Sequence, residues 1–162
     1  MPDVVSNTTP LQYLHQVGRL DLLPRLYGRV IVPRAVADEL RQGQLKGIDV
    51  PILPALAWVT VQPVAPVELQ RVPAALDAGE REAMALALGR KDPLLLLDDA
   101  AARTQAKTLG IRFTGTLGVL VRAKHAGHIS TVRPYLDQLD EAGFYLRPDV
   151  RELVLRLAGE AS

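Results

Sequence analysis

The chain has 162 residues and a formal net charge of +1, with 48% hydrophobic and 23% charged residues. This length predicts one domain spanning residues 1–162, and the composition is typical of a globular protein. The sequence contains no cysteine, which excludes disulfides, a thiolate zinc site and a cysteine nucleophile. Because it shows neither a signal peptide nor an apolar run of membrane-spanning length, we expect a cytoplasmic protein with no membrane partner.

Apolar strands and helices alternate along the predicted chain. The strands are expected at residues 4–6, 30–32, 58–61, 94–97 and 112–114. The helices are expected at residues 10–17, 20–26, 34–42, 77–89, 100–109, 116–126, 131–142 and 149–158. Thr9 and Pro10 have the residue types of an N-cap and first helical residue, and the Pro-rich stretch 43–73 reads as a connector. This order predicts an α/β fold, a doubly wound three-layer sandwich with a central parallel sheet.

Reactive groups in such sheets gather beyond the carboxyl ends of the strands. Asn7 directly follows the first predicted strand, and Asp98 and Asp99 directly follow the strand at 94–97. One aspartate of this pair would serve as a helix N-cap. A cap needs only one side chain, so the other is a candidate for function.

Two glutamates on predicted helices could point to the same edge. Glu39 borders the apolar stripe of its helix, although it could equally be a solvated surface residue. Glu82 lies on a helix that is otherwise almost entirely apolar, where a charge is costly unless it is paired or bound to a cation. Glu80 has another explanation in a capping box with Asp77, so we favour Glu82 over Glu80.

Carboxylates gathered at one edge repel each other, by about 4 kcal/mol for a pair 4 Å apart at an effective dielectric constant near 20. A hard divalent cation removes this repulsion, and Mg²⁺ and Mn²⁺ both favour oxygen ligands. Such a cation activates water and neutralises the transition state of phosphodiester cleavage. The acidic residues therefore predict a Mg²⁺ or Mn²⁺ site.

Basic residues dominate one stretch of the sequence. Between Asp99 and Asp137 there are six Arg or Lys residues and no acid. Arg103 and Lys107 share a helix face at i, i+4 spacing, and Lys124 could extend the same track for RNA, although all of them could be ordinary surface charges. The Gly-rich turn at 114–118 includes Thr116 and could hold a phosphate at a helix N-terminus, or be a plain tight turn.

Several segments together resemble the PIN domain family, in its branch of VapC-type toxins. The resemblance covers about residues 3–130 and leaves 131–162 as C-terminal helices. It is carried by the segments VVSNTTPL, GRLDLL, VPRAVADEL, LDAGEREAMALA, LLLDDAAAR and TGTLGVLVRAK followed by GHI. This resemblance implies a doubly wound sheet, ribonuclease activity that depends on Mg²⁺ or Mn²⁺, a homodimer, and a small antitoxin protein as partner.

The family's acids map one by one onto this sequence. Its first aspartate falls on Asn7, its second acid on Glu39 and its third on Glu82, and the fourth falls on Asp98 or Asp99. Its supporting hydroxyl falls on Thr8 or Thr9. Asn7 departs from the family pattern because an amide brings no charge to a metal site. The alternative to a ribonuclease is therefore a catalytically weak or inactive module that binds nucleic acid or a protein.

Overall fold

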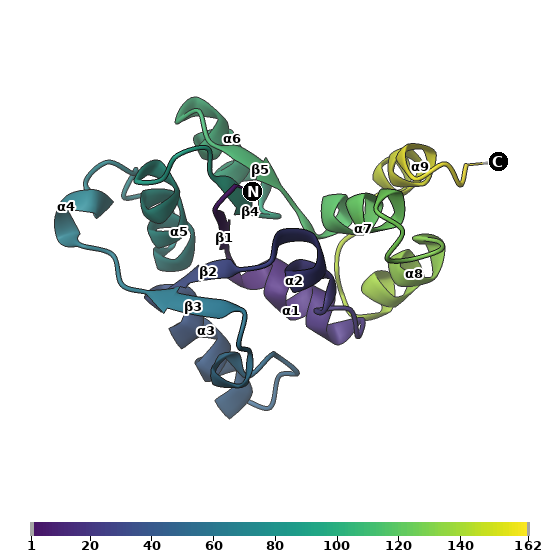
Figure 1. Ribbon diagram of the computed structural model, residues 1–162, viewed down its shortest axis with the longest axis horizontal. Helices are drawn as coiled ribbons and strands as arrows, with labels where there is room; N and C mark the ends of the chain where they lie inside the picture. Colours follow the sequence, from purple (N-terminus) through teal and green to yellow (C-terminus); the bar gives the residue numbers. More distant parts are fainter. Residues whose placement is uncertain (1, 162) are drawn as a thin grey trace.

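The computed structural model describes residues 2–161 and contains one parallel sheet of five strands in the order β3-β2-β1-β4-β5. The strands are β1 (Val4–Ser6), β2 (Val30–Pro33), β3 (Val59–Gln62), β4 (Leu94–Leu96) and β5 (Arg112–Thr114). The chain winds outward from β1 to β3 and then returns to the other side of β1 (Figure 1). The predicted doubly wound parallel fold is confirmed.

Helices cover both faces of the sheet (Figure 1). They are α1 (Thr8–Gln16), α2 (Leu22–Tyr27), α3 (Arg34–Leu45), α4 (Pro66–Leu69), α5 (Ala78–Leu88), α6 (Ala100–Thr108), α7 (Thr116–His125), α8 (Arg133–Glu141) and α9 (Pro148–Leu157), with a 3-10 turn at Leu53–Ala55. Within residues 2–161, no helix combines the length and apolar character needed to cross a membrane.

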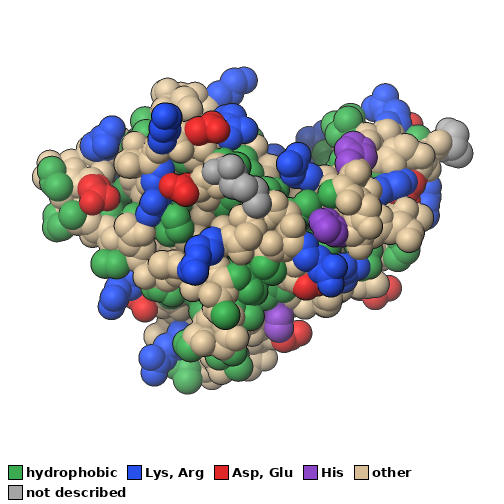
Figure 2. Space-filling view, in the orientation of Figure 1, with side chains coloured by type: hydrophobic (Ala, Val, Ile, Leu, Met, Phe, Trp, Pro, Cys, Tyr) green, Lys and Arg blue, Asp and Glu red, His purple; other side chains and the backbone are tan. Residues whose placement is uncertain are grey.

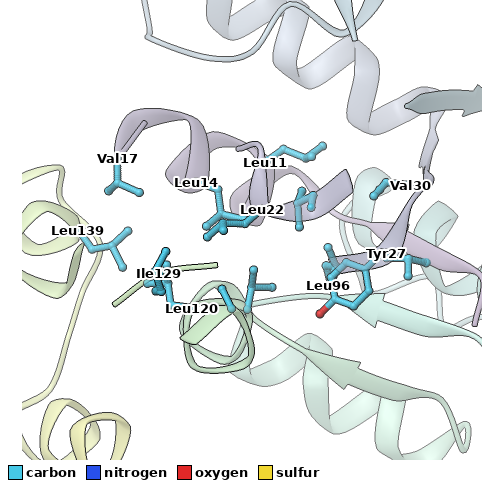
Figure 3. Packing of buried hydrophobic residues seen from close by; sticks show 14 of the residues in the cluster. Leu11, Leu14, Val17, Leu22, Tyr27, Val30, Leu96, Leu120, Ile129 and Leu139 are labelled. Carbon is cyan, nitrogen blue, oxygen red and sulfur yellow. The ribbon is translucent and has the colours of Figure 1, made fainter. Parts of the chain in front are cut away.

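Alternate strand residues feed two separate cores, as the two-residue period of a strand requires. Val4 and Leu96 join a larger cluster with α1, α2, α3 and α7, whereas Val5 and Leu95 join a smaller one with α5 and α6. Figure 3 shows Leu14 of α1 and Leu120 of α7 among the residues that meet in the larger cluster. Both clusters leave the carboxyl ends of the strands accessible for polar groups.

The start of α1 corrects one prediction. The helix begins at Thr8 with Asn7 as its N-cap, whereas the sequence favoured Thr9 as the cap and Pro10 as the first residue. Pro10 is tolerated because the third residue of a helix still has no intrahelical acceptor for its N–H. The shift places Asn7 and Thr8 together at the strand-to-helix junction.

The connector at 43–73 contains more structure than the sequence suggested. Besides β3 it holds the 3-10 turn and the short helix α4, and α3 continues to Leu45. The predicted strand is present, shifted by one residue, and pairs with β2. The stretch therefore supplies the edge strand of the sheet.

Candidate active site

The candidate site lies where β1 and β4 end side by side. The Asn7 N–H donates to Leu96 O at 3.0 Å, which continues the β1–β4 ladder past the end of both strands. β1 and β4 are also the strands between which the winding direction reverses. Crevices of open parallel sheets form at such a reversal, beyond the carboxyl ends of the strands.

Asn7 and Glu39 converge on the first turn of α5. A Cβ added to Gly79 would lie 2.6 Å from Glu39 Oε1 and 3.2 Å from Asn7 Oδ1, so both oxygens rest against this glycine. The Thr8 hydroxyl donates to Glu39 Oε2 at 2.6 Å and orients the carboxylate. For Thr9, the other predicted hydroxyl, the structure of residues 2–161 gives no side-chain hydrogen bond.

Glu80 is the buried acid of the site. Only 9% of it is exposed, and its pKa is raised to about 7, first because burial disfavours the charged form and then because the charges of Asp77 and Asp99 lie nearby. A hydrogen bond with the Asp77 backbone opposes this rise in part. The expected cap is present as well, since the Glu80 N–H donates to Asp77 Oδ1 at 2.8 Å.

Glu82, which the sequence favoured over Glu80, has a different partner. Its Oε1 accepts the Ala35 N–H at 3.0 Å and so caps the first turn of α3. The charge of Glu82 on its largely apolar helix is therefore stabilised by a backbone donor from another helix. The sequence already placed Asp77 beside Glu80, but only the fold brings the charge of Asp99 near it.

Asp98 and Asp99 each cap a different helix. Asp98 Oδ1 and Oδ2 accept the Thr116 N–H and hydroxyl, both at 2.7 Å, at the start of α7. Burial raises the pKa of Asp98, while these two hydrogen bonds and the charge of Arg103 oppose the rise. Asp99 Oδ2 accepts the Ala102 N–H at 2.8 Å in α6, and its charge also acts on Glu80.

The donor chemistry fits a hard divalent cation. Asn7, Glu39, Glu80 and Asp99 offer oxygen ligands, and the charges of Asp77 and Asp99 that act on Glu80 are of the sign that a cation would offset. In the part of the chain that the structure describes, no three acidic, His or Cys side chains already surround one point. Water would therefore supply several ligands, as is usual for Mg²⁺.

The four predicted RNA contacts lie in different environments. Arg103 Nε donates to Leu97 O at 2.7 Å beside the site, and Lys107 lies exposed one turn further along α6. Thr116 is buried, and its hydroxyl donates a hydrogen bond to Asp98 Oδ2. Lys124 lies near the far end of α7 and pairs with Glu160 at 3.0 Å. The two residues on α6 are therefore the better placed.

Comparison with known families agrees with this geometry. The model of a family described as "PIN domain" matches residues 3–160, so the match continues through the C-terminal helices, beyond the segments that carried the resemblance. A search of curated proteins finds no match to the chain.

Proposed function

Because the chain belongs to the PIN domain family, we propose that it is a ribonuclease that depends on Mg²⁺ or Mn²⁺ and acts as the toxin of a toxin–antitoxin pair. The observation that supports this most directly is the convergence of Asn7 and Glu39 on Gly79, next to the buried Glu80, on which the charge of Asp99 also acts. These oxygens stand at the edge where a doubly wound sheet presents its reactive groups.

Asn7, Glu39, Glu80 and Asp99 are the residues that would hold the cation. When bound, a divalent cation lowers the pKa of a coordinated water and neutralises the charge that develops on the phosphodiester. Thr8 keeps the Glu39 carboxylate in place through its 2.6 Å hydrogen bond. The pKa of about 7 of Glu80 holds without metal, and a bound cation would lower it because positive charge favours the ionised carboxylate.

Two further groups position the substrate side of the site. Asp98 fixes the start of α7 to the end of β4 through its two hydrogen bonds with Thr116. Arg103 is held beside Asp98 by Leu97 O and by the ring of Phe113, 5.2 Å from the guanidinium carbon. A guanidinium fixed in this way presents positive charge to a phosphate of the RNA.

Cleavage of a mixed, end-labelled RNA tests the proposal. Wild type should cleave in millimolar Mn²⁺ and stop in EDTA, and Glu80→Gln should slow cleavage about 100-fold or more. Glu141→Gln, at an exposed position on α8, is the matched control and should cleave as wild type does. Cleavage that persists in EDTA, or equal rates for Glu80→Gln and wild type, would contradict a metal-dependent mechanism.

A substitution of Glu82 tests whether Glu80 or Glu82 is the third acid of the site. Glu82→Gln keeps the size of the side chain and its ability to accept from Ala35, so it should fold and retain most cleavage. The opposite result, cleavage lost in Glu82→Gln and kept in Glu80→Gln, would restore the assignment that the sequence favoured.

The second candidate is a binding module without catalysis. Three predicted acids, Glu82, Asp98 and Asp99, already accept backbone N–H groups, and Asn7 brings no charge. Under this alternative, wild type would bind RNA in EDTA and fail to cleave it in Mn²⁺. Light scattering of the purified chain tests the homodimer, and co-purification with a small protein encoded beside it tests the antitoxin.

A further inference from the structure

A cleft of about 500 Å³ opens beside Asp98, outside the group of acids described above. One wall of the cleft is formed by the start of α6 and the end of β5. The other wall is formed by α9 and the loop between α8 and α9. The space-filling view shows the surface hollowed between the part that carries α6 and the part that carries α9, with Lys and Arg side chains around the hollow (Figure 2). This volume is in the range of small-ligand sites.

Aromatic side chains are concentrated in this cleft. The sequence has one Trp, four Tyr and two Phe, and three of these residues, Phe113, Phe144 and Tyr145, line it. Phe144 is anchored edge-on against Tyr13, with ring centroids 5.0 Å apart. Tyr145 follows it directly and is 82% exposed, so its ring stands in water at the cleft wall.

The charges around the cleft favour an anion at its walls. Arg103 is fixed by Leu97 O, and Arg147 projects from the α8–α9 loop. Arg147 donates two hydrogen bonds to Asp149, at 3.1 and 3.0 Å, but both side chains are exposed, so a phosphate can compete with this carboxylate for the guanidinium. Asp98, the carboxylate that lines the cleft, is already satisfied by the N–H and hydroxyl of Thr116.

We propose that this cleft binds one nucleotide of single-stranded RNA next to the reacting phosphodiester, with its base stacked on Tyr145 and its phosphate beside Arg103 and Arg147. The inference rests on the proposed action on RNA and specifies how the strand is held. A base can reach an aromatic ring only when it is unpaired, so the occupant is a single strand. The small number of aromatic residues fits this arrangement, since one stacked base needs one exposed ring.

Binding of fluorescently labelled RNA octamers in EDTA tests the proposal without cleavage. Tyr145→Ala should weaken binding about tenfold, the lower range for loss of one stacked base, whereas Tyr145→Phe should bind within twofold of wild type. Val67→Ala removes another highly exposed apolar side chain, on α4, and should have no effect. Arg147→Gln should reduce the slope of log affinity against log salt by about 0.7.

An abasic octamer with the same phosphates provides the decisive comparison. It should bind wild type and Tyr145→Ala equally, because the ring then has no base to contact. The proposal is overturned if wild type and Tyr145→Ala bind the normal octamer equally. It is also overturned if Tyr145→Ala loses as much affinity for the abasic octamer as for the normal one, or if wild type does not bind the normal octamer. If Tyr145→Ala weakens binding while wild type shows no Mn²⁺-dependent cleavage, the nucleotide cleft stands and the nuclease function fails.

Discussion

The Thr8 hydroxyl donates a 2.6 Å hydrogen bond to Glu39 Oε2 across 31 residues of sequence, and so joins the start of α1 to α3. Because Glu39 is exposed and water can replace the lost bond, Thr8→Val should cost only about 1 kcal/mol of unfolding free energy. Its larger effect should be on metal binding, since the Glu39 carboxylate loses its fixed orientation.

The shift in melting temperature on adding Mn²⁺ measures this effect. At a hundred times the Kd, binding stabilises the fold by about 2.7 kcal/mol, or roughly 5–10 °C for a domain of this size. Thr8→Val should show a clearly smaller shift at the same Mn²⁺ concentration, and Thr8→Ser should keep it. Thr9→Val is the control, and an equal loss in both valine variants would mean that the hydroxyl of Thr8 has no special role.

Gly79→Ala should impair the site from the helix side. The new methyl group would lie 2.6 Å from Glu39 Oε1 and 3.2 Å from Asn7 Oδ1, so the Glu39 carboxylate must move away from the first turn of α5. Alanine also favours the helix, by up to about 1 kcal/mol over glycine, which offsets part of the cost in stability. We expect a folded protein whose Mn²⁺-induced melting shift is largely lost.

Gly89→Ala, at the other end of α5, is the matched control. Its added Cβ would meet its nearest neighbour, Leu86 O, at 3.7 Å, an ordinary contact. A full Mn²⁺ shift in Gly79→Ala would show that the convergence of Asn7 and Glu39 on this glycine is not needed for cation binding.

Asn7→Asp should have opposite effects with and without metal. The new carboxylate would face the Glu39 carboxylate at the same glycine, and two like charges placed so close repel each other, although solvent at the exposed Glu39 weakens the repulsion. In EDTA the variant should therefore melt below wild type, whereas in Mn²⁺ it should gain stability and cleave RNA faster. A variant that melts below wild type by the same amount in both conditions would argue against a cation at Asn7.

Glu80 should make the stability depend on pH. Its pKa is about 7 in the folded protein against the ordinary value of 4.5 for a glutamate, so between these values the folded state binds more protons than the unfolded state. Stability from this residue is therefore fully present below pH 4.5 and is lost as the pH rises through 7, by up to about 3 kcal/mol. Urea unfolding in EDTA should show this fall for wild type and a flatter profile for Glu80→Gln. Parallel profiles for the two proteins would contradict the raised pKa.

The two basic residues of α6 should separate RNA affinity from stability. Lys107→Gln should reduce the salt slope of RNA binding by about 0.7 and leave the melting temperature unchanged, because Lys107 is exposed. Arg103→Gln should also lower stability, by about 1–2 kcal/mol, since Leu97 O loses a donor and Phe113 its stacked guanidinium. An unchanged slope in Lys107→Gln would place the RNA on another face.

The sheet could be predicted because local signals determine it. Short apolar runs such as Leu94–Leu96 pair in a buried parallel sheet, and their positions set which polar residues reach its edge. Asn7 and Asp99 were proposed in this way, whereas Glu39 was proposed from its place beside the apolar stripe of its helix. The start of α1 was missed because Thr9-Pro10 imitates a cap and first residue, and the sequence gives no measure of how tightly Asn7 follows the strand.

The choice between Glu80 and Glu82 depended on contacts that periodicity does not contain. Glu82 is satisfied by Ala35, which is 47 residues away in the chain, and Glu80 is made a weak acid by burial and by Asp99. The cleft at Tyr145 was missed for a similar reason: its walls come from β5, α6 and the α8–α9 loop, which only the folded chain brings together.

Glu160, just after α9, accepts the Val132 N–H at the start of α8 and the Lys124 ammonium at the end of α7. These noncovalent contacts bring the two ends of the segment 124–160 together, and this segment includes the loop that carries Tyr145. Such closure removes conformational freedom from the loop before a ligand arrives. The wall of the cleft is thus preorganised, and little entropy is left to lose when a nucleotide binds.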